Sequence, residues 1–203
     1  TAGSGTVTIS SAGTITNVNA DTTTEVTAGT FAVSAATSVG ALGTNNAIDI
    51  DATTMDITSA GAVYADATGS GGSAITVDAA AGAITLGSTT EALTLTSVDT
   101  DNGVITVATT DQNIVTTVVD SSGNNTALNL TTTDTGNISL AGVTAGSGTV
   151  TISSAGTITN VTANTTTEVT AGTFTVSAAD TVGASGTNNA IDIDATTMDI
   201  TSA

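Results

Sequence analysis

The sequence contains no Lys, Arg, His, Pro, Cys or Trp, and its formal net charge is −18. Proteins that bind nucleic acids or anionic membrane surfaces use Lys and Arg to neutralise phosphates, so the composition excludes both classes of partner. A transmembrane helix needs about 20 consecutive apolar residues. The sequence has no such run, so we expect no membrane insertion in this segment.

The same absences remove most catalytic chemistry. Without His, Cys or Lys the chain has no nucleophile–base pair and no amine for a Schiff base. Only carboxylates remain, and a carboxylate pair is the usual machinery of a glycosidase. We therefore predict that the protein is not an enzyme, and we assign no catalytic and no cofactor-binding residue. A β-helix that acts on glycans is retained as a less favoured alternative.

A long internal repeat dominates the chain. Residues 1–60 return as residues 144–203, an offset of 143, and 54 of the 60 aligned pairs are identical. The six differences are Asn19/Thr162, Asp21/Asn164, Ala32/Thr175, Thr37/Asp180, Ser38/Thr181 and Leu42/Ser185. We predict that residues 1–143 form one full tandem unit of a continuous structure and that residues 144–203 begin the next, within a longer array.

Short runs of alternating apolar and polar residues recur between turn-forming residues. This period of two, rich in Val, Ile and Thr, is typical of β-strands, and no stretch has the period of an amphipathic helix. The predicted strands are 5–9, 13–16, 30–33, 47–50, 54–57, 74–77, 83–86, 92–95, 104–107, 114–118, 127–130 and 137–140.

The fold class is therefore all-β, and two architectures accommodate the strands. In a parallel β-solenoid, coils of roughly 18–24 residues stack on one another around a thin apolar core. The alternative is a tandem array of antiparallel β-sandwiches. The sequence has no Trp or Pro and only 1% aromatic residues, a composition that favours the solenoid, whose opposing walls lie close together.

The run Gly5–Asn17 (GTVTISSAGTITN) resembles the strand–turn–strand repeats of filamentous-haemagglutinin-type adhesins and autotransporter passenger domains. These families are secreted, right-handed parallel β-helices that form long surface fibres and adhere to hosts, substrates or other cells. The resemblance implies a right-handed β-helix, an extracellular or cell-surface location, and cell-surface or glycan ligands.

Calcium is the one cofactor for which the sequence offers ligands, because hard cations bind carboxylate oxygens. Asp99 and Asp101 lie together in a predicted turn, which also reads as an ordinary Asn-Gly turn with solvating acids. Asp49 and Asp51, with their repeats Asp192 and Asp194, are the other candidates. Because Asp49, Asp51 and Asp56 alternate with isoleucines, we expect all three to point outward as a solvated face.

We therefore predict a structural or adhesive segment of a giant extracellular tandem-repeat fibre. Its main partner would be itself, along the fibre axis or between neighbouring copies. A calcium-linked surface-layer or biofilm-matrix protein is the alternative, and regular Thr-x-Thr runs leave ice binding as a less favoured one.

Overall fold

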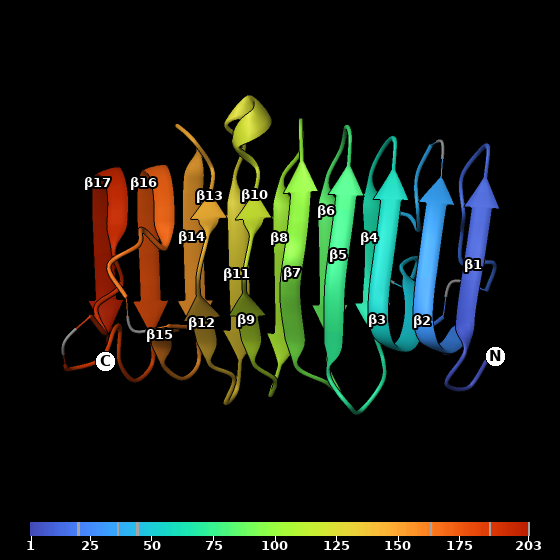
Figure 1. Cartoon of the computed structure of the whole chain (residues 1–203), viewed down its shortest axis with the longest axis horizontal. Coiled ribbons are helices and arrows are strands. Elements are labelled where there is room, and N and C mark those ends of the chain that lie inside the picture. The colour runs from blue at the N-terminus through green and yellow to red at the C-terminus, as the bar shows by residue number, and fades with distance from the viewer. Residues whose placement is uncertain (20, 36, 44, 163, 187, 203) are drawn as a thin grey trace.

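The structure, a computed structural model, describes residues 1–19, 21–35, 37–43, 45–162, 164–186 and 188–202. It is a parallel β-solenoid of about 8 turns with about 23 residues per coil and 2% helix. The strands form a single 17-stranded sheet wound around the long axis, with the termini at opposite ends (Figure 1). The solenoid prediction is confirmed. The sandwich alternative is wrong, because every strand pair among the described residues is parallel.

Two walls of stacked strands enclose the core, and we call the near wall in Figure 1 face A and the far wall face B. Face A contains β1 (Thr6–Ser11), β5 (Ser73–Ala79), β7 (Leu93–Thr100), β9 (Ile114–Thr116), β10 (Val119–Asp120), β12 (Ile138–Leu140), β13 (Val143–Thr144) and β15 (Ile158–Asn160). Face B contains β4 (Val63–Ala67), β6 (Ile84–Ser88), β8 (Ile105–Thr110), β11 (Leu128–Thr133) and β14 (Thr149–Ser154). Four longer strands turn an edge and belong to both faces: β2 (Val26–Ala35), β3 (Ile48–Ser59), β16 (Val169–Ala178) and β17 (Ile193–Ser202). Within the described ranges one 3-10 turn is present, η1 (Ser122–Asn124), between β10 and β11.

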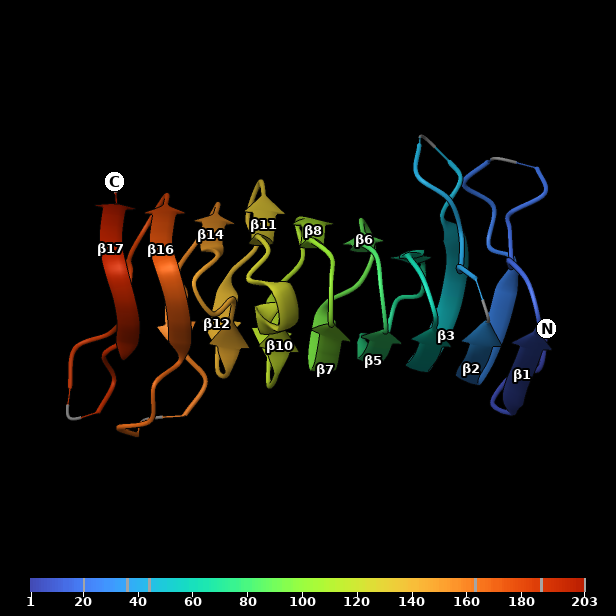
Figure 2. The same cartoon turned by 90° about the horizontal axis from the view of Figure 1, so that it is seen from above.

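The coil winds in the right-handed sense. In Figure 1 the chain advances from right to left, the near strands run upward and the far strands run downward. Figure 2 places the same near strands on one side of the axis and the far strands on the other. The number of residues in one coil is smallest where Ile48 pairs with Ala65 and largest where Val143 pairs with Val169. These two coil lengths fall just outside the predicted range of roughly 18–24 residues. The short coil has a tight turn between β3 and β4, and the long coil has a long connection between β15 and β16.

Apolar rows from the two faces fill the core. Alternation along each strand places every second side chain inward, and stacking then aligns these side chains along the axis. On face B the row includes Leu86, Val107 and Leu130, all at most 2% exposed. Burial of one such side chain stabilises a fold by about 1.5–3 kcal/mol. Because each coil adds several, the stack needs few large aromatic residues, and Phe31 and Phe174 are the two completely buried phenylalanines of this core.

The two copies of the repeated segment have the same internal register but lie on opposite faces. Thr6 pairs with Thr30 and, in the second copy, Thr149 pairs with Thr173. From Ile9, one row on face A passes through Val33, Ile57, Val77, Val98 and Val119 to Val143, which takes six turns. The counterpart of Ile9 is Ile152, half a turn further on, and it pairs with Leu130 on face B. One 143-residue offset therefore corresponds to six and a half turns.

Figure 2 makes this half-turn visible. The blue connections of the first copy project on one side of the solenoid, whereas the orange and red connections of the second copy project on the other. The identical strands β1 and β14 accordingly run in opposite directions in Figure 1.

Most predicted strands are present, but the predicted run 114–118 ends at Thr116 in β9, and the two-residue strands β10 and β13 were not predicted. Three further differences concern longer segments. The runs 47–50 and 54–57 are one strand, β3, that turns an edge of the coil. The run 13–16 contributes only an isolated bridge between Ile15 and Val39. The strand β4 was not predicted, because its inward residues after Val63 are two alanines, which give a weak hydrophobic pattern.

Candidate functional site

Three carboxylates from three successive coils lie in one row on face B. Glu25 precedes β2, and its backbone N–H donates to the Asp49 carbonyl oxygen at 2.9 Å. The Asp49 backbone N–H donates in return to Glu25 Oε2 at 2.8 Å. Asp49 then pairs in register with Asp66 of β4. The parallel stack therefore brings together acids that lie far apart in the sequence.

Asp49 is the unusual member of this row, because it is only 4% exposed. No hydrogen bond among the described residues ends on its carboxylate, whose oxygens keep contact with the solvent, because none of the fully buried side-chain oxygens in the described part of the chain lacks a partner. Its pKa is raised from 3.8 to about 6, first by burial and then by the nearby negative charges of Glu25, Asp66 and Asp21. The expectation that Asp49 belongs to a solvated face is wrong, because the neighbouring coils and the connection before β2 cover it. The same expectation holds for Asp56, which is exposed, whereas Asp51 is half-buried.

The Asp49 and Asp66 side chains line a groove of about 580 Å³ on face B. Gly87 follows Asp66 in the row and Ala108 follows Gly87, so two small residues leave the surface hollow. A Cβ at Gly87 would overlap Asp66 Oδ1, which shows that this carboxylate lies directly over the glycine. The remaining wall is rich in hydroxyl groups: Thr22, Thr24, Thr68, Ser88, Thr89, Thr90, Thr109, Thr110 and Thr133.

A second acidic row lies on face A. Asp78, Asp99 and Asp120 occupy the same outward position on three successive coils. The pKa of Asp99 is raised, by burial first and then by Asp120, Asp101 and Asp78. Asp99 is half-buried, and Asp78 and Asp101 are exposed. Unlike Asp49, none of these acids is enclosed.

A third acidic residue, Glu91, binds the turn between β4 and β5 through hydrogen bonds. The Glu91 side chain, 3% exposed, accepts hydrogen bonds from the backbone N–H groups of Gly69 (3.2 Å) and Gly72 (2.9 Å). It also accepts one from Ser73 Oγ at 2.8 Å. Asp51 lies beside the same glycine, since a Cβ at Gly69 would come within 2.7 Å of Asp51 Oδ1 and within 3.1 Å of both Glu91 carboxylate oxygens. Glu91 therefore holds a glycine-rich turn in place.

The sequence candidates for calcium are thus distributed over separate places. Asp49 lies in the face B groove, Asp51 beside the Glu91 turn, and Asp99 with Asp101 on face A. Asp192 repeats the contact of Asp49, with its N–H donating to Glu168 Oε2 at 2.7 Å, and Asp194 is exposed in β17. Within the described residues, no three or more acidic side chains converge as a metal centre. Sequence reasoning missed Glu25, Asp66 and Glu91, whose positions become meaningful only when the stacking register is known.

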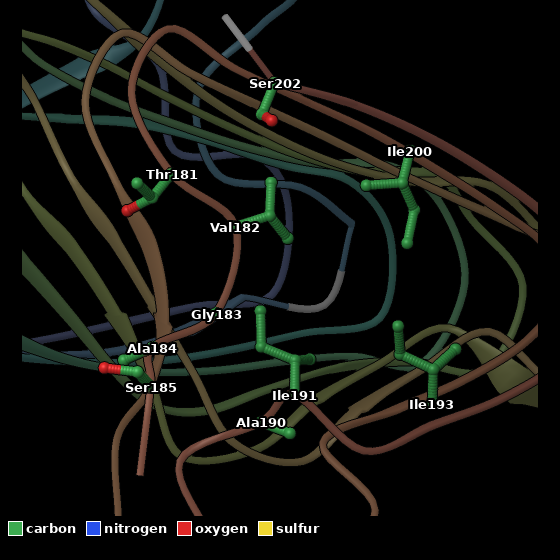
Figure 3. A pocket seen from close by; sticks show the side chains of 10 residues that line it. All are labelled: Thr181, Val182, Gly183, Ala184, Ser185, Ala190, Ile191, Ile193, Ile200 and Ser202. Carbon is green, nitrogen blue, oxygen red and sulfur yellow. The ribbon is translucent and has the colours of Figure 1, made fainter.

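The C-terminal end of the solenoid is an open apolar hollow of about 500 Å³ (Figure 3). Val182, Ile191, Ile193 and Ile200 face this hollow from the last coil. Ile200 is 48% exposed, whereas its counterpart Ile57 in the first copy is completely buried. The difference arises because Val77 of the next coil stacks on Ile57.

No family model matches the chain, and no curated protein or solved structure is detectably similar to it. Across the described ranges, no helix is long and apolar enough to cross a membrane.

Proposed function

We propose that the chain is a rigid segment of an extracellular structural fibre, built from tandem units that stack into one continuous solenoid. The observation that carries this proposal is the stacking at the junction between the two copies. Leu128 of the first unit pairs with Val150 of the second, and Val143 pairs with Val169. The hydrogen-bonded stack and the apolar core therefore run through the junction without interruption, as a lengthening rod requires.

Self-association along the axis follows from the two ends of such a rod. An end coil presents unpaired backbone N–H and C=O groups, which are ready to pair with another strand. At the C-terminal end this edge surrounds the apolar hollow of Val182, Ile193 and Ile200. In the first copy the equivalent surface is covered by β4 and β5, so the strand edge of another copy would fit it. We expect pairing with the next unit of the array or with another copy.

The surface of the rod supports an extracellular and adhesive role. Eighteen acidic residues without a single basic one keep neighbouring rods apart by charge repulsion, and rows of hydroxyl groups are available for hydrogen bonds to glycans. The resemblance of Gly5–Asn17 to adhesin repeats favours the same role. Cell-surface or glycan ligands are therefore the partners that we propose beyond the fibre itself.

The alternatives receive unequal support. The calcium-linked matrix or surface-layer protein gains support from the enclosed Asp49. Ice binding needs a flat, uninterrupted threonine array, but one outward row of face A runs Thr8, Ala32, Asp56, Thr76 and Ser97. No specific observation supports the alternative of a β-helix that acts on glycans.

Immunogold microscopy of intact source cells, with antibodies raised against the 203-residue chain, tests the proposal. We expect gold particles along filaments outside the cell. Recombinant arrays of two and three units should also form rods that lengthen by about 31 Å per unit, since six and a half coils stack at about 4.8 Å each. Gold confined to the cell interior, or arrays that do not lengthen in this proportion, would contradict it.

A further inference from the structure

The buried Asp49 carboxylate has a charge that nothing in the chain can neutralise. Buried acids in proteins are ordinarily paired with Lys or Arg or coordinate a metal, but this sequence contains no Lys, Arg or His. The three ionisable groups whose charges act on it, Glu25, Asp66 and Asp21, are all acidic and raise the cost of its charge. Any compensating cation must therefore come from solution.

The geometry points to calcium: we propose that Asp49 and Asp66 bind a Ca²⁺ ion in the face B groove, with threonine hydroxyls and water completing its shell. The two residues are register partners on adjacent strands, so their carboxylates project from neighbouring positions about 4.8 Å apart along the axis. That separation allows one ion to contact both. The proposal is independent of whether the rod is part of a fibre.

Two features of the groove, its oxygen-bearing side chains and its open volume, favour a hard cation. Every polar side chain that lines it carries oxygen, from a carboxylate or a hydroxyl group. Asp66 Oδ1 fills the space that Gly87 leaves, and the groove of about 580 Å³ beside it gives room for an ion that keeps part of its water. Thr24 Oγ1 and Thr68 Oγ1 are 2.9 Å apart, which joins the connection before β2 to the coil that carries Asp66.

Calcium fits this set better than magnesium. Ca²⁺ accepts 6–8 oxygen ligands in flexible geometry, whereas Mg²⁺ demands a near-ideal octahedron and gives up water reluctantly. Two protein carboxylates make a weak site, comparable with extracellular calcium modules whose dissociation constants are about 10⁻⁴–10⁻³ M. The acids of face A lack the decisive feature, because Asp78 and Asp101 are exposed, Asp99 and Asp120 are half-buried, and none is as deeply buried as Asp49.

The single tyrosine of the chain provides a local probe. Tyr64 precedes Asp66 by two residues on the same outward side of β4, about 7 Å along the strand. Terbium, which replaces calcium in oxygen sites, emits when a nearby tyrosine is excited. Terbium bound in the groove should therefore luminesce, whereas terbium scattered over the remaining acidic surface should not.

The experiment titrates the 203-residue chain with Tb³⁺ and then displaces the ion with Ca²⁺. We expect saturable luminescence, displacement by millimolar Ca²⁺, and a loss of affinity of at least tenfold in Asp49→Asn and in Asp66→Asn. Tyr64→Phe should abolish the luminescence but leave calcium binding by calorimetry unchanged.

The matched control is Asp180→Thr, which removes one exposed charge and installs the residue that the first copy has at position 37. It should bind terbium as the parent chain does. Since Asn has nearly the same shape as Asp, an unchanged circular dichroism spectrum will show that both groove variants fold. Luminescence that survives both Asn variants, that falls equally in Asp180→Thr, or that calcium does not displace would overturn the proposal.

Discussion

Replacement of Glu91 by alanine should destabilise the turn between β4 and β5 strongly. Glu91 accepts hydrogen bonds from Gly69, Gly72 and Ser73. The Ser73 hydroxyl has a single hydrogen, and it also lies 2.7 Å from the Ala52 carbonyl oxygen. It therefore keeps a partner in the variant, and only the two glycine N–H groups lose theirs.

The magnitude follows from how far water can reach these two groups. Gly69 is buried, so its unpaired N–H should cost about 1–3 kcal/mol. Gly72 is half-buried and can bond to water, so only the net value of its hydrogen bond is lost, about 0.5–1.5 kcal/mol. We expect a total of about 2–4 kcal/mol. Glu91→Gln keeps one carboxamide oxygen as acceptor and should lose roughly half as much.

Hydrogen exchange is the appropriate assay, because repeat proteins open locally and need not unfold in one step. Amide protection should fall over residues 68–80 in Glu91→Ala and remain unchanged in distant coils. Asp180→Thr, an exposed change, should stay within about 0.5 kcal/mol of the parent. If Glu91→Ala leaves the protection of Gly69 and Gly72 within that same margin, the role assigned to the buried carboxylate is refuted.

The remaining predictions concern pH and packing. Burial raises the pKa values of Asp49, Asp66 and Asp99, so between about pH 4 and pH 6 the folded state holds more protons than the unfolded state. Without calcium, stability should therefore increase on acidification from pH 7 to pH 4, and Asp49→Asn should flatten this rise in thermal melts; a fall on acidification would contradict it. A Cβ at Gly103 would overlap a backbone carbonyl of the coil below, so Gly103→Ala should lower the melting temperature measurably. Gly13→Ala, where nothing lies within 4 Å, should not.

The strands could be predicted from the sequence because their signal is local. Val, Ile and Leu at every second position mark the inward side chains of runs such as 83–86 and 104–107, and both are strands in the structure. The signal weakens where alanine fills the inward position. For that reason Val63–Ala67 went unnoticed, although it stacks as regularly as its neighbours.

The acidic groove could not be predicted in the same way. Parallel stacking brings Glu25, Asp49 and Asp66 together from unequal separations along the sequence, and no local pattern encodes that inequality. Alternation placed Asp49 outside the apolar core, which is true, but it could not show that other coils would enclose an outward side chain. Burial of a polar residue on the outside of a solenoid depends on the connections, whose conformation the strand pattern does not determine.

The half-turn between the two copies sets the symmetry of any longer array that keeps this register. Successive 143-residue units would be related by a two-fold screw, so the axial period would contain two units, thirteen coils and about 62 Å at 4.8 Å per coil. A feature carried once per unit, such as the Asp49–Asp66 groove, would alternate between opposite sides of the rod about every 31 Å. Such a filament therefore presents the groove on both of its sides. Where calcium offsets the repulsion between acidic rods, such a filament can engage a neighbour on each flank at once, which suits a component of a sheet or network as well as an isolated fibre.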